Sequence, residues 1–346
     1  MKQIIDKLEQ THQLSRQEYR TLLEDDHPDH TSYLIERAAS VSQQHFGKTI
    51  YVRGLIEFTN YCKNDCYYCG IRKSNCAVSR YRLSEEDILQ CCKTGYDLGF
   101  LTFVLQGGED PYWNDQRLCS VVKAIRKAHP DCAITLSVGE RSRESYQRLF
   151  DAGADRYLLR HETAHAGHYQ LLHPKNLTLA HRMHCLKELK EIGYQTGCGF
   201  MVGSPGQTLD HIIDDLCFLW DFQPHMVGIG PFLPSKGTPF SGEPAGSYQL
   251  TIKLLSMVRL MLPRVLLPTT TALGTATEDG RQLGILAGAN VIMPNLSPAN
   301  VREKYLLYDN KIATGDEAAE SIQQLKQSMN QIGYQIVSAR GDYQDK

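Results

Sequence analysis

The chain has 346 residues, of which 42% are hydrophobic and 22% charged, and its formal net charge is −2 at pH 7. This composition is that of an ordinary globular protein, and the near-neutral charge argues against a disordered acidic chain and against nucleic acid as a partner. The length accommodates one barrel of about 250 residues with an extension at each end.

Residues 1–47 have the apolar spacing of amphipathic helices. This segment is charged and lacks the apolar stretch of a signal peptide, and no apolar run in the chain approaches the ~18 residues of a membrane span. We therefore expect an N-terminal helical extension over residues 1–47 and a cytoplasmic protein with no membrane partner. The eleven cysteines are then expected to be reduced, and most of them to be core residues.

From residue 48 onward, short strand-like runs alternate with longer helical ones. Such alternation is typical of parallel strands joined by crossover helices, and its many repeats favour a closed barrel over an open sheet. The sequence therefore predicts an α/β fold, a (β/α)8 TIM barrel over residues 48–312, followed by a C-terminal helix and tail over residues 313–346. The predicted strands are Ile50–Phe58, Leu101–Gln106, Ala133–Val138, Arg156–His161, Gly197–Val202, Met226–Gly230, Leu266–Thr271 and Asn290–Pro294.

Three cysteines follow the first predicted strand, in the stretch CKNDCYYCG at residues 62–70. In a parallel barrel this position belongs to the face that carries the active site. Structural zinc takes four ligands, usually in two close pairs, so His45 or Cys76 would have to complete a zinc site here. A four-iron cluster held by the thiolates of Cys62, Cys66 and Cys69, with one iron left open for another ligand, fits better.

The spacing C-x3-C-x2-C, with Tyr68 before the third cysteine, resembles the signature of the radical S-adenosylmethionine (SAM) superfamily. The resemblance implies one 4Fe-4S cluster on Cys62, Cys66 and Cys69, with SAM bound to the open iron. It also implies an electron donor such as ferredoxin or flavodoxin, and cleavage of SAM to methionine and a 5′-deoxyadenosyl radical. A barrel interior keeps water away from such a radical and holds its target in reach.

The same resemblance implies that further residues bind SAM. The stretch QGGED at residues 106–110 resembles the glycine-rich turn that binds the methionyl amino group, since glycine permits close approach and a carboxylate pairs with an ammonium group. Arg182 is expected to bind the methionyl carboxylate and Met226 to pack on adenine, with a solvated arginine and a plain core methionine as the alternatives. The expected cofactor-binding set is Tyr68, Gly107, Gly108, Glu109, Thr135, Glu162, Arg182 and Met226.

Longer stretches resemble the HydE group of this superfamily, which are maturases of iron–iron hydrogenase. They occur in the same order and extend the resemblance over roughly residues 1–312. The stretches are IEFTNYCKNDCYYCGIR (56–72), VLQGGEDPY (104–112), DRYLLRHETA (155–164), MVGSPGQT (201–208), HMVGIGPFLP (225–234), PTTTALGT (268–275) and GANVIMPNLSP (288–298).

The HydE resemblance implies a small organometallic substrate, an iron–carbonyl–cyanide–cysteine complex used in assembly of the hydrogenase H-cluster, and contact with the maturases HydG and HydF. Internal ion pairs with Glu57 or Glu162 are the alternative for the arginines of the expected substrate site, and strand packing is the alternative for its threonines. The expected substrate-binding residues are Arg53, Arg160, Thr269, Thr270, Thr271 and Tyr305.

Two features depart from the HydE group. Many of its members have three further cysteines near the C-terminus for a second cluster, whereas residues 308–324 read YDNKIATGDEAAESIQQ and contain none. We therefore expect a single cluster. Gly107 stands where the group often has serine, which puts one contact near the SAM sulfonium in doubt.

Three other functions are compatible with the sequence. An enzyme like methylornithine synthase, acting on lysine, would need charged groups for both ends of an amino acid, such as Arg160 with an inner carboxylate. An enzyme like biotin synthase would need cysteines inside the barrel, where Cys198 is the one clear candidate. A non-enzymatic iron carrier or electron relay is disfavoured because a relay cluster would have four cysteines, and SAM cleavage under reductant would exclude it.

Overall fold

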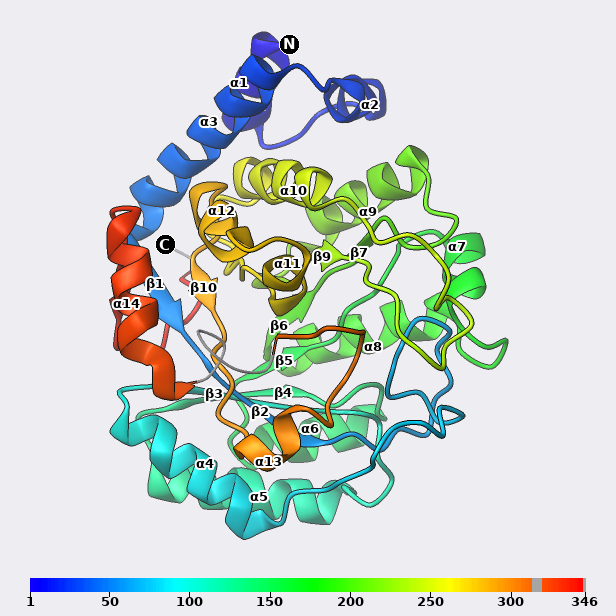
Figure 1. The fold of residues 1–346 in the computed structure, drawn as a ribbon, viewed down its shortest axis with the longest axis vertical. Coiled ribbons are helices and arrows are strands. Elements are labelled where there is room, and N and C mark those ends of the chain that lie inside the picture. The colour runs from blue at the N-terminus through cyan, green and yellow to red at the C-terminus, as the bar shows by residue number, and fades with distance from the viewer. Residues whose placement is uncertain (313–318, 345–346) are drawn as a thin grey trace.

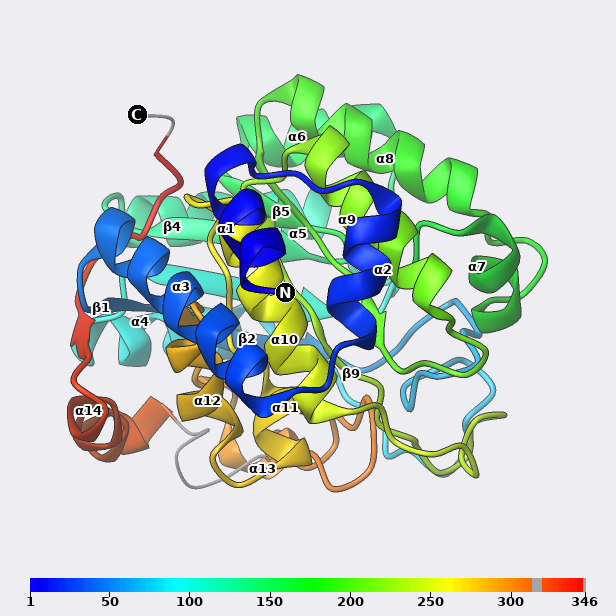
Figure 2. The same ribbon diagram turned by 90° about the horizontal axis from the view of Figure 1, so that it is seen from above.

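Three helices come before the barrel in the computed structural model, which describes residues 1–312 and 319–344. They are α1 (Lys2–Thr11), α2 (Arg16–Glu24) and α3 (Pro28–Phe46). They pack on the outside of the barrel against α9 (Leu209–Phe222) and α10 (Tyr248–Met261) (Figures 1 and 2). Lys253 of α10 fixes the end of α2, because its Nζ donates to the Asp25 carbonyl at 2.6 Å. Among the described residues, no helix is long and apolar enough to cross a membrane.

A closed ring of parallel strands forms the centre of the molecule. β1 (Thr49–Val52) and β2 (Gly54–Thr59) make one strand that is interrupted at Arg53. Single bridges, Met226 to Leu266 and Pro268 to Val291, continue the ring, and β10 (Val291–Ile292) closes it by pairing with β1. The predicted (β/α)8 barrel is confirmed. Between β2 and the first bridge the order is β3 (Thr102–Gly107), β4 (Ala133–Ser137), β5 (Arg156–Leu158), β6 (Gln195–Cys198) and β8 (Met226–Val227).

Helices surround this ring and cover its outer surface (Figure 1). Along β4, Ile134 and Leu136 belong to the hydrophobic core, whereas Thr135 and Ser137 alternate with them and face the barrel interior. The remaining helices are α4 (Glu85–Asp97), α5 (Asp115–Ala128), α6 (Arg143–Asp151), α7 (Ala166–Leu172), α8 (Leu179–Ile192), α11 (Thr271–Ala276), α12 (Gly280–Leu286), α13 (Ala299–Arg302), η2 (Ala319–Ser321) and α14 (Ile322–Gln331).

The seventh strand is shorter than the predicted strand Leu266–Thr271. The prediction was wrong at the carboxyl end, where helix α11 begins. Thr270 is the N-cap residue of α11, and its Oγ1 accepts a hydrogen bond from the Leu273 N–H at 3.4 Å. Because a capping residue turns the chain into the helix, Thr270 and Thr271 leave the barrel wall, whereas the Thr269 N–H still donates to the Val291 carbonyl at 3.0 Å. Two short strands, β7 (Met201–Val202) and β9 (Gly230–Pro231), pair with each other beyond β6 and β8.

The C-terminal segment is built into the amino-terminal end of the barrel. β11 (Gln335–Val337) pairs in parallel with β1. Beyond it, the fully buried Arg156 of β5 donates to Asp342 Oδ1 at 2.6 Å and to the Arg340 carbonyl at 2.8 Å. The predicted polar tail therefore packs against β1 and β5. The predicted division into residues 1–47, 48–312 and 313–346 stays a prediction, and residues 313–318 and 345–346 of its last part lie outside the described residues.

Candidate active site

The cysteine loop follows β2 at the carboxyl end of the barrel and is held by side-chain contacts to its backbone. Arg80 donates to the carbonyls of Ile71 at 2.8 Å, Arg72 at 2.6 Å and Asn75 at 3.1 Å. Arg72 also forms an ion pair with Asp65, Nη2 to Oδ2 2.6 Å. These contacts between protein groups fix the conformation of the loop. Arg80 was not singled out from the sequence, because nothing local marks an arginine that binds main-chain carbonyls.

Cys62, Cys66 and Cys69 are free thiols that lie partly buried in this loop. Burial raises the pKa of Cys69 to about 12, with a smaller contribution from the Cys62 thiolate. Burial also raises the pKa of Cys66 well above its ordinary value, and the charges of Cys69 and Cys62 add to this effect. Three mutually close thiols of this kind need a cation to become thiolates, and binding it would release their protons.

The thiol arrangement fits a cluster better than a single ion. The described residues contain no group of three or more His, Cys, Asp or Glu side chains that could hold one metal ion. Thiolates that bind an iron–sulfur cluster coordinate different irons and therefore need not converge on one point. His45, considered above for zinc, lies near Arg264 and Tyr343 beside a different cavity.

The glycine-rich turn after β3 touches the cysteine loop directly. A Cβ at Gly108 would lie 2.2 Å from the Tyr61 carbonyl oxygen and 2.8 Å from Cys62 Cβ, so this approach requires glycine. The Gly108 N–H donates to the Thr59 carbonyl at 3.2 Å. Backbone of the turn therefore supports the loop at Cys62.

A cavity of about 270 Å³ opens at the carboxyl end of the barrel beside Cys69. Its apolar wall includes Leu158, Met201 and Phe232, and its polar wall includes Gln106 and Ser137. None of these was predicted as a site residue, although the strand positions of Leu158, Gln106 and Ser137 were a usable signal. The predicted residues that line the cavity are Tyr68, Cys69, Gly107, Arg160, Glu162 and Tyr305.

Glu162 has an unusual backbone at this cavity. Its φ of 65° lies in the left-handed region, which a residue with a side chain adopts at some energetic cost. Its Oε2 lies 3.2 Å from Arg160 Nη2, so the two residues present a cation and an anion side by side. The alternative of an ion pair between Arg160 and Glu162 is therefore what the structure contains.

Arg182 and Glu140 form a second ion pair beside the cysteine loop. Arg182 is buried on α8, and its Nε donates to Glu140 Oε1 at 2.5 Å. Its charge lowers the pKa of Cys66, although burial has the larger, opposite effect. The solvated arginine considered above is thus wrong. Glu140 was not predicted as a site residue from the sequence.

Glu109 does not line the 270 Å³ cavity. Its Oε1 accepts from the Glu140 N–H at 2.9 Å, and its Oε2 lies 3.2 Å from Lys63 Nζ. It faces a neighbouring cavity of about 300 Å³ that Lys63 and Glu140 also line. The glycine-rich turn lies where the sequence predicts it. The Glu109 carboxylate, however, is bound by the Glu140 N–H and by Lys63.

The barrel interior contains a buried arginine whose guanidinium is only partly hydrogen-bonded. Arg53 is 4% exposed, and its Nε and Nη2 have no partner among the described residues. Its Nη1 donates to the sulfur of Met226 at 3.0 Å, which places Met226 against Arg53 rather than on the cavity wall. Thr135 Oγ1 is also buried without a partner. Glu57, the alternative partner of Arg53, is bound instead by Lys311 and Asn295.

The three threonines predicted for the substrate do not line the cavity, although the neighbouring Ala272 does. Thr270 caps α11, Thr271 begins this helix, and Thr269 Oγ1 donates to the Gly280 carbonyl at 3.4 Å. Local helix chemistry therefore accounts for the positions of Thr270 and Thr271.

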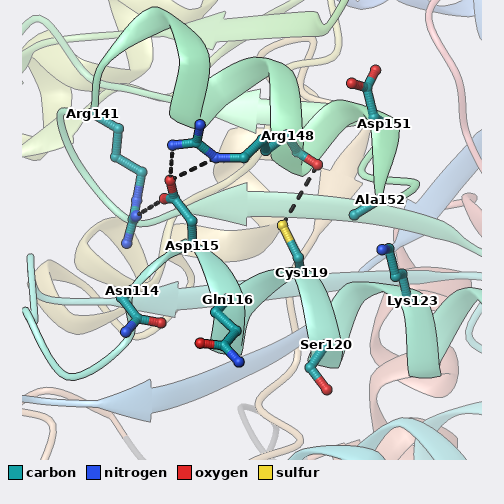
Figure 3. A pocket seen from close by; sticks show the side chains of 10 residues that line it. All are labelled: Asn114, Asp115, Gln116, Cys119, Ser120, Lys123, Arg141, Arg148, Asp151 and Ala152. Carbon is teal, nitrogen blue, oxygen red and sulfur yellow. Dashed lines mark hydrogen bonds and ion pairs between the residues drawn. The ribbon is translucent and has the colours of Figure 1, made fainter.

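A larger cavity, of about 1120 Å³, lies between α5 and α6 (Figure 3). Three of its charged groups are paired with one another: Asp115 binds Arg141 at 2.9 Å and accepts from Arg148 Nε at 2.9 Å. The sulfur of Cys119 donates to the Arg148 carbonyl at 3.6 Å. None of the predicted site residues lines this groove, so it is not the candidate site.

The chain is similar to known radical SAM proteins in sequence and in structure. Residues 56–219 match the family described as the radical SAM superfamily. The [FeFe] hydrogenase maturase subunit HydE of Thermotoga maritima is 42% identical over 90% of this chain and 88% of its own length. The 3-methylornithine synthase of Methanosarcina barkeri is 30% identical over 92% and 89% of the two chains. A solved structure of methylornithine synthase (PylB) is 28% identical in sequence and has a TM-score of 0.86, covering 96% of this chain and 97% of its own. A solved structure of HydG is 19% identical and has a TM-score of 0.82, covering 97% of this chain and 76% of its own.

Proposed function

Because the chain belongs to the radical SAM superfamily as a homologue of the hydrogenase maturase HydE, we propose that it acts on an anionic iron–carbonyl–cyanide–cysteine complex in assembly of the iron–iron hydrogenase H-cluster. As a radical SAM enzyme it uses a 4Fe-4S cluster and SAM. Bound together, these groups supply a 5′-deoxyadenosyl radical after one-electron reduction.

The residues of the site support distinct tasks in this proposal. Cys62, Cys66 and Cys69 would hold the cluster, with Gly108 allowing their loop to pack closely. Tyr68 and Glu162 border the cavity beside Cys69, where SAM would lie. The apolar wall of this cavity would keep water from the reacting groups.

The observation that carries the substrate proposal is the buried guanidinium of Arg53, two of whose nitrogens have no partner among the described residues. A buried cation without a hydrogen-bonded anion is strongly unfavourable, and an anionic ligand would remove that penalty. Thr135 offers an unused hydroxyl donor in the same barrel interior. A small metal complex with negative charge and acceptor ligands suits a buried guanidinium of this kind.

A second candidate function is the reaction of methylornithine synthase on an amino acid. The adjacent charges of Arg160 and Glu162, 3.2 Å apart on the cavity wall, suit the carboxylate and ammonium groups of a free amino acid. The 42% identity to HydE against 30% to methylornithine synthase favours the maturase. HydG, HydF and a ferredoxin or flavodoxin are the partners that the proposal includes.

An anaerobic assay separates the two candidates. The reconstituted protein is given SAM, dithionite and the synthetic iron complex, and 5′-deoxyadenosine or an adenosyl adduct is followed together with the EPR spectrum. A new substrate-derived EPR signal that is lost in Cys66→Ala is expected. SAM cleavage that responds to lysine and ignores the complex would overturn the maturase proposal and support the amino-acid reaction.

A further inference from the structure

Helix α7 carries a tyrosine whose hydroxyl is buried without a partner. Tyr169 is 1% exposed, and its Oη makes no hydrogen bond to any described residue. Buried hydroxyl groups in folded proteins nearly always have partners, because an unpaired one is unfavourable. An orphan hydroxyl near a ligand site therefore indicates a hydrogen bond that the ligand completes.

The ring of Tyr169 is fixed by contacts that do not involve its hydroxyl. It stacks on His173 with ring centroids 3.9 Å apart and an angle of 17° between the planes. The Tyr169 carbonyl lies 2.8 Å from His173 Nδ1, and a carbonyl can only accept, so Nδ1 carries the proton. His173 Nε2 is then the acceptor for the Tyr68 hydroxyl at 3.3 Å. The stack links Tyr169 to the residue that precedes Cys69.

The surroundings of Tyr169 belong to the candidate active site. The guanidinium carbon of Arg182 lies 5.9 Å from the ring centroid. Burial raises the pKa of Tyr169, and the charges of Arg182, Glu140, Cys66 and Glu162 also act on it. A group bound between the cysteine loop and Arg182 would lie beside this tyrosine. Arg182 already donates to Glu140 and to the Arg160 carbonyl, and the Tyr169 hydroxyl would be a second donor for an anion bound beside it.

We propose that Tyr169 is a further cofactor-binding residue, whose hydroxyl donates a hydrogen bond to the α-carboxylate of SAM beside Arg182. This inference rests on the use of SAM by the superfamily and not on the identity of the second substrate. A tyrosine hydroxyl bound to a carboxylate forms a charge-assisted hydrogen bond, which is stronger than a neutral one.

The test compares Tyr169→Phe with Tyr19→Phe. Tyr19 on α2 is an equally buried tyrosine, 1% exposed, that lies outside the candidate active site. SAM binding to the cluster-loaded full chain is measured by equilibrium dialysis without reductant, so that no turnover occurs. We expect the dissociation constant to rise about tenfold in Tyr169→Phe and to stay unchanged in Tyr19→Phe.

Thermal unfolding of the cluster-loaded, SAM-free protein is the second readout. Tyr169→Phe should unfold at the same or a higher temperature, because the variant loses a hydroxyl that has no partner. Unchanged SAM affinity with a lower unfolding temperature would show a structural partner and overturn the proposal. If SAM affinity is unchanged but the EPR spectrum of the reduced, SAM-free cluster is altered, the Tyr169 hydroxyl bonds to Cys66 and not to SAM. That result would also overturn the proposal. None of these measurements uses the iron complex, so they test the role of Tyr169 independently of the maturase proposal.

Discussion

His161 and Asp215 form a fully buried pair, with His161 Nε2 3.2 Å from Asp215 Oδ1. The Gly199 N–H lies 3.2 Å from His161 Nδ1, so Nδ1 accepts and Nε2 carries the proton. Asp215 Oδ1 also accepts from the Ala164 N–H at 2.6 Å. These contacts fix the chain on both sides of Glu162, whose left-handed backbone needs such support.

Loss of the Asp215 carboxylate is therefore expected to release this turn. Asp215→Ala leaves the Ala164 N–H and the His161 Nε2–H without an acceptor and should lower the free energy of unfolding by about 2–4 kcal/mol. Asp215→Asn keeps one acceptor oxygen and should lower it by less than about 1.5 kcal/mol. Urea unfolding measures both. Equal losses in the two variants would contradict the role assigned to the accepting oxygen.

Two buried histidines, His168 in α7 and His173 at its end, contribute to the pH dependence of stability. Burial lowers the pKa of His173 to about 3 and that of His168 to about 4. In the unfolded chain both titrate near ~6.5, so below that pH the unfolded state binds more protons and stability falls as the pH falls. Between pH 7.5 and 5.5 each histidine should remove about 1.4 kcal/mol of unfolding free energy.

Urea unfolding at the two pH values checks this expectation, with His173→Gln as the matched variant. Glutamine can donate to the Tyr169 carbonyl and accept from the Tyr68 hydroxyl, but it does not titrate. The variant should therefore lose about 1.4 kcal/mol less than the wild type over this interval. An identical loss in both proteins would mean that His173 is not the neutral, buried group described here.

The barrel could be predicted from the sequence because its signals are local and repeated. Each strand is a short apolar run that is followed by a segment with the apolar spacing of a helix. The three cysteines have the fixed spacing C-x3-C-x2-C and follow the first strand. The Arg156–Asp342 contact was missed, since no local pattern links residues so far apart in the chain. β11 was missed because a strand of three residues has no readable periodicity.

Side-chain roles were harder to predict than backbone positions. Thr270 has the strand propensity that suggested a barrel wall, yet its hydroxyl caps a helix, which is equally typical of threonine. Met226 and Met201 both lie on short strands of the barrel. Met201 lines the cavity, whereas Met226 contacts Arg53, and only the structure distinguishes the two positions. Glu109 is in the predicted turn, but its orientation depends on Glu140 in another turn.

Gly108 offers a direct test of the cluster loop. Gly108→Ala places a Cβ 2.2 Å from the Tyr61 carbonyl oxygen, which must move and carry Cys62 with it. We expect about four irons per wild-type chain, for one cluster, and less than half of that in the variant. Gly242→Ala is the control, because a Cβ there meets nothing within 4 Å. A wild-type count near eight would contradict the single cluster, and full iron content in Gly108→Ala would contradict the close packing.

Arg53 and Arg259 are both buried arginines, but they differ in their partners. Arg259 donates to the carbonyls of Gly288 at 2.7 Å, Pro263 at 2.8 Å and Val265 at 2.9 Å, whereas Arg53 has two nitrogens without a partner. Arg259→Met should therefore lower the free energy of unfolding by about 3–5 kcal/mol. Arg53→Met removes an unpaired buried charge and should leave stability unchanged or raise it by about 1–4 kcal/mol.

If Arg53 binds the anionic substrate, Arg53→Met should also lose function while it gains stability. We expect turnover stimulated by the iron complex to fall at least about tenfold, since a charge-assisted hydrogen bond is lost. SAM cleavage without the complex should persist, because Arg53 does not line the cavity beside Cys69. Assays of 5′-deoxyadenosine with and without the complex measure both rates. A stable variant with full complex-stimulated turnover would show that the orphan guanidinium has no part in substrate binding.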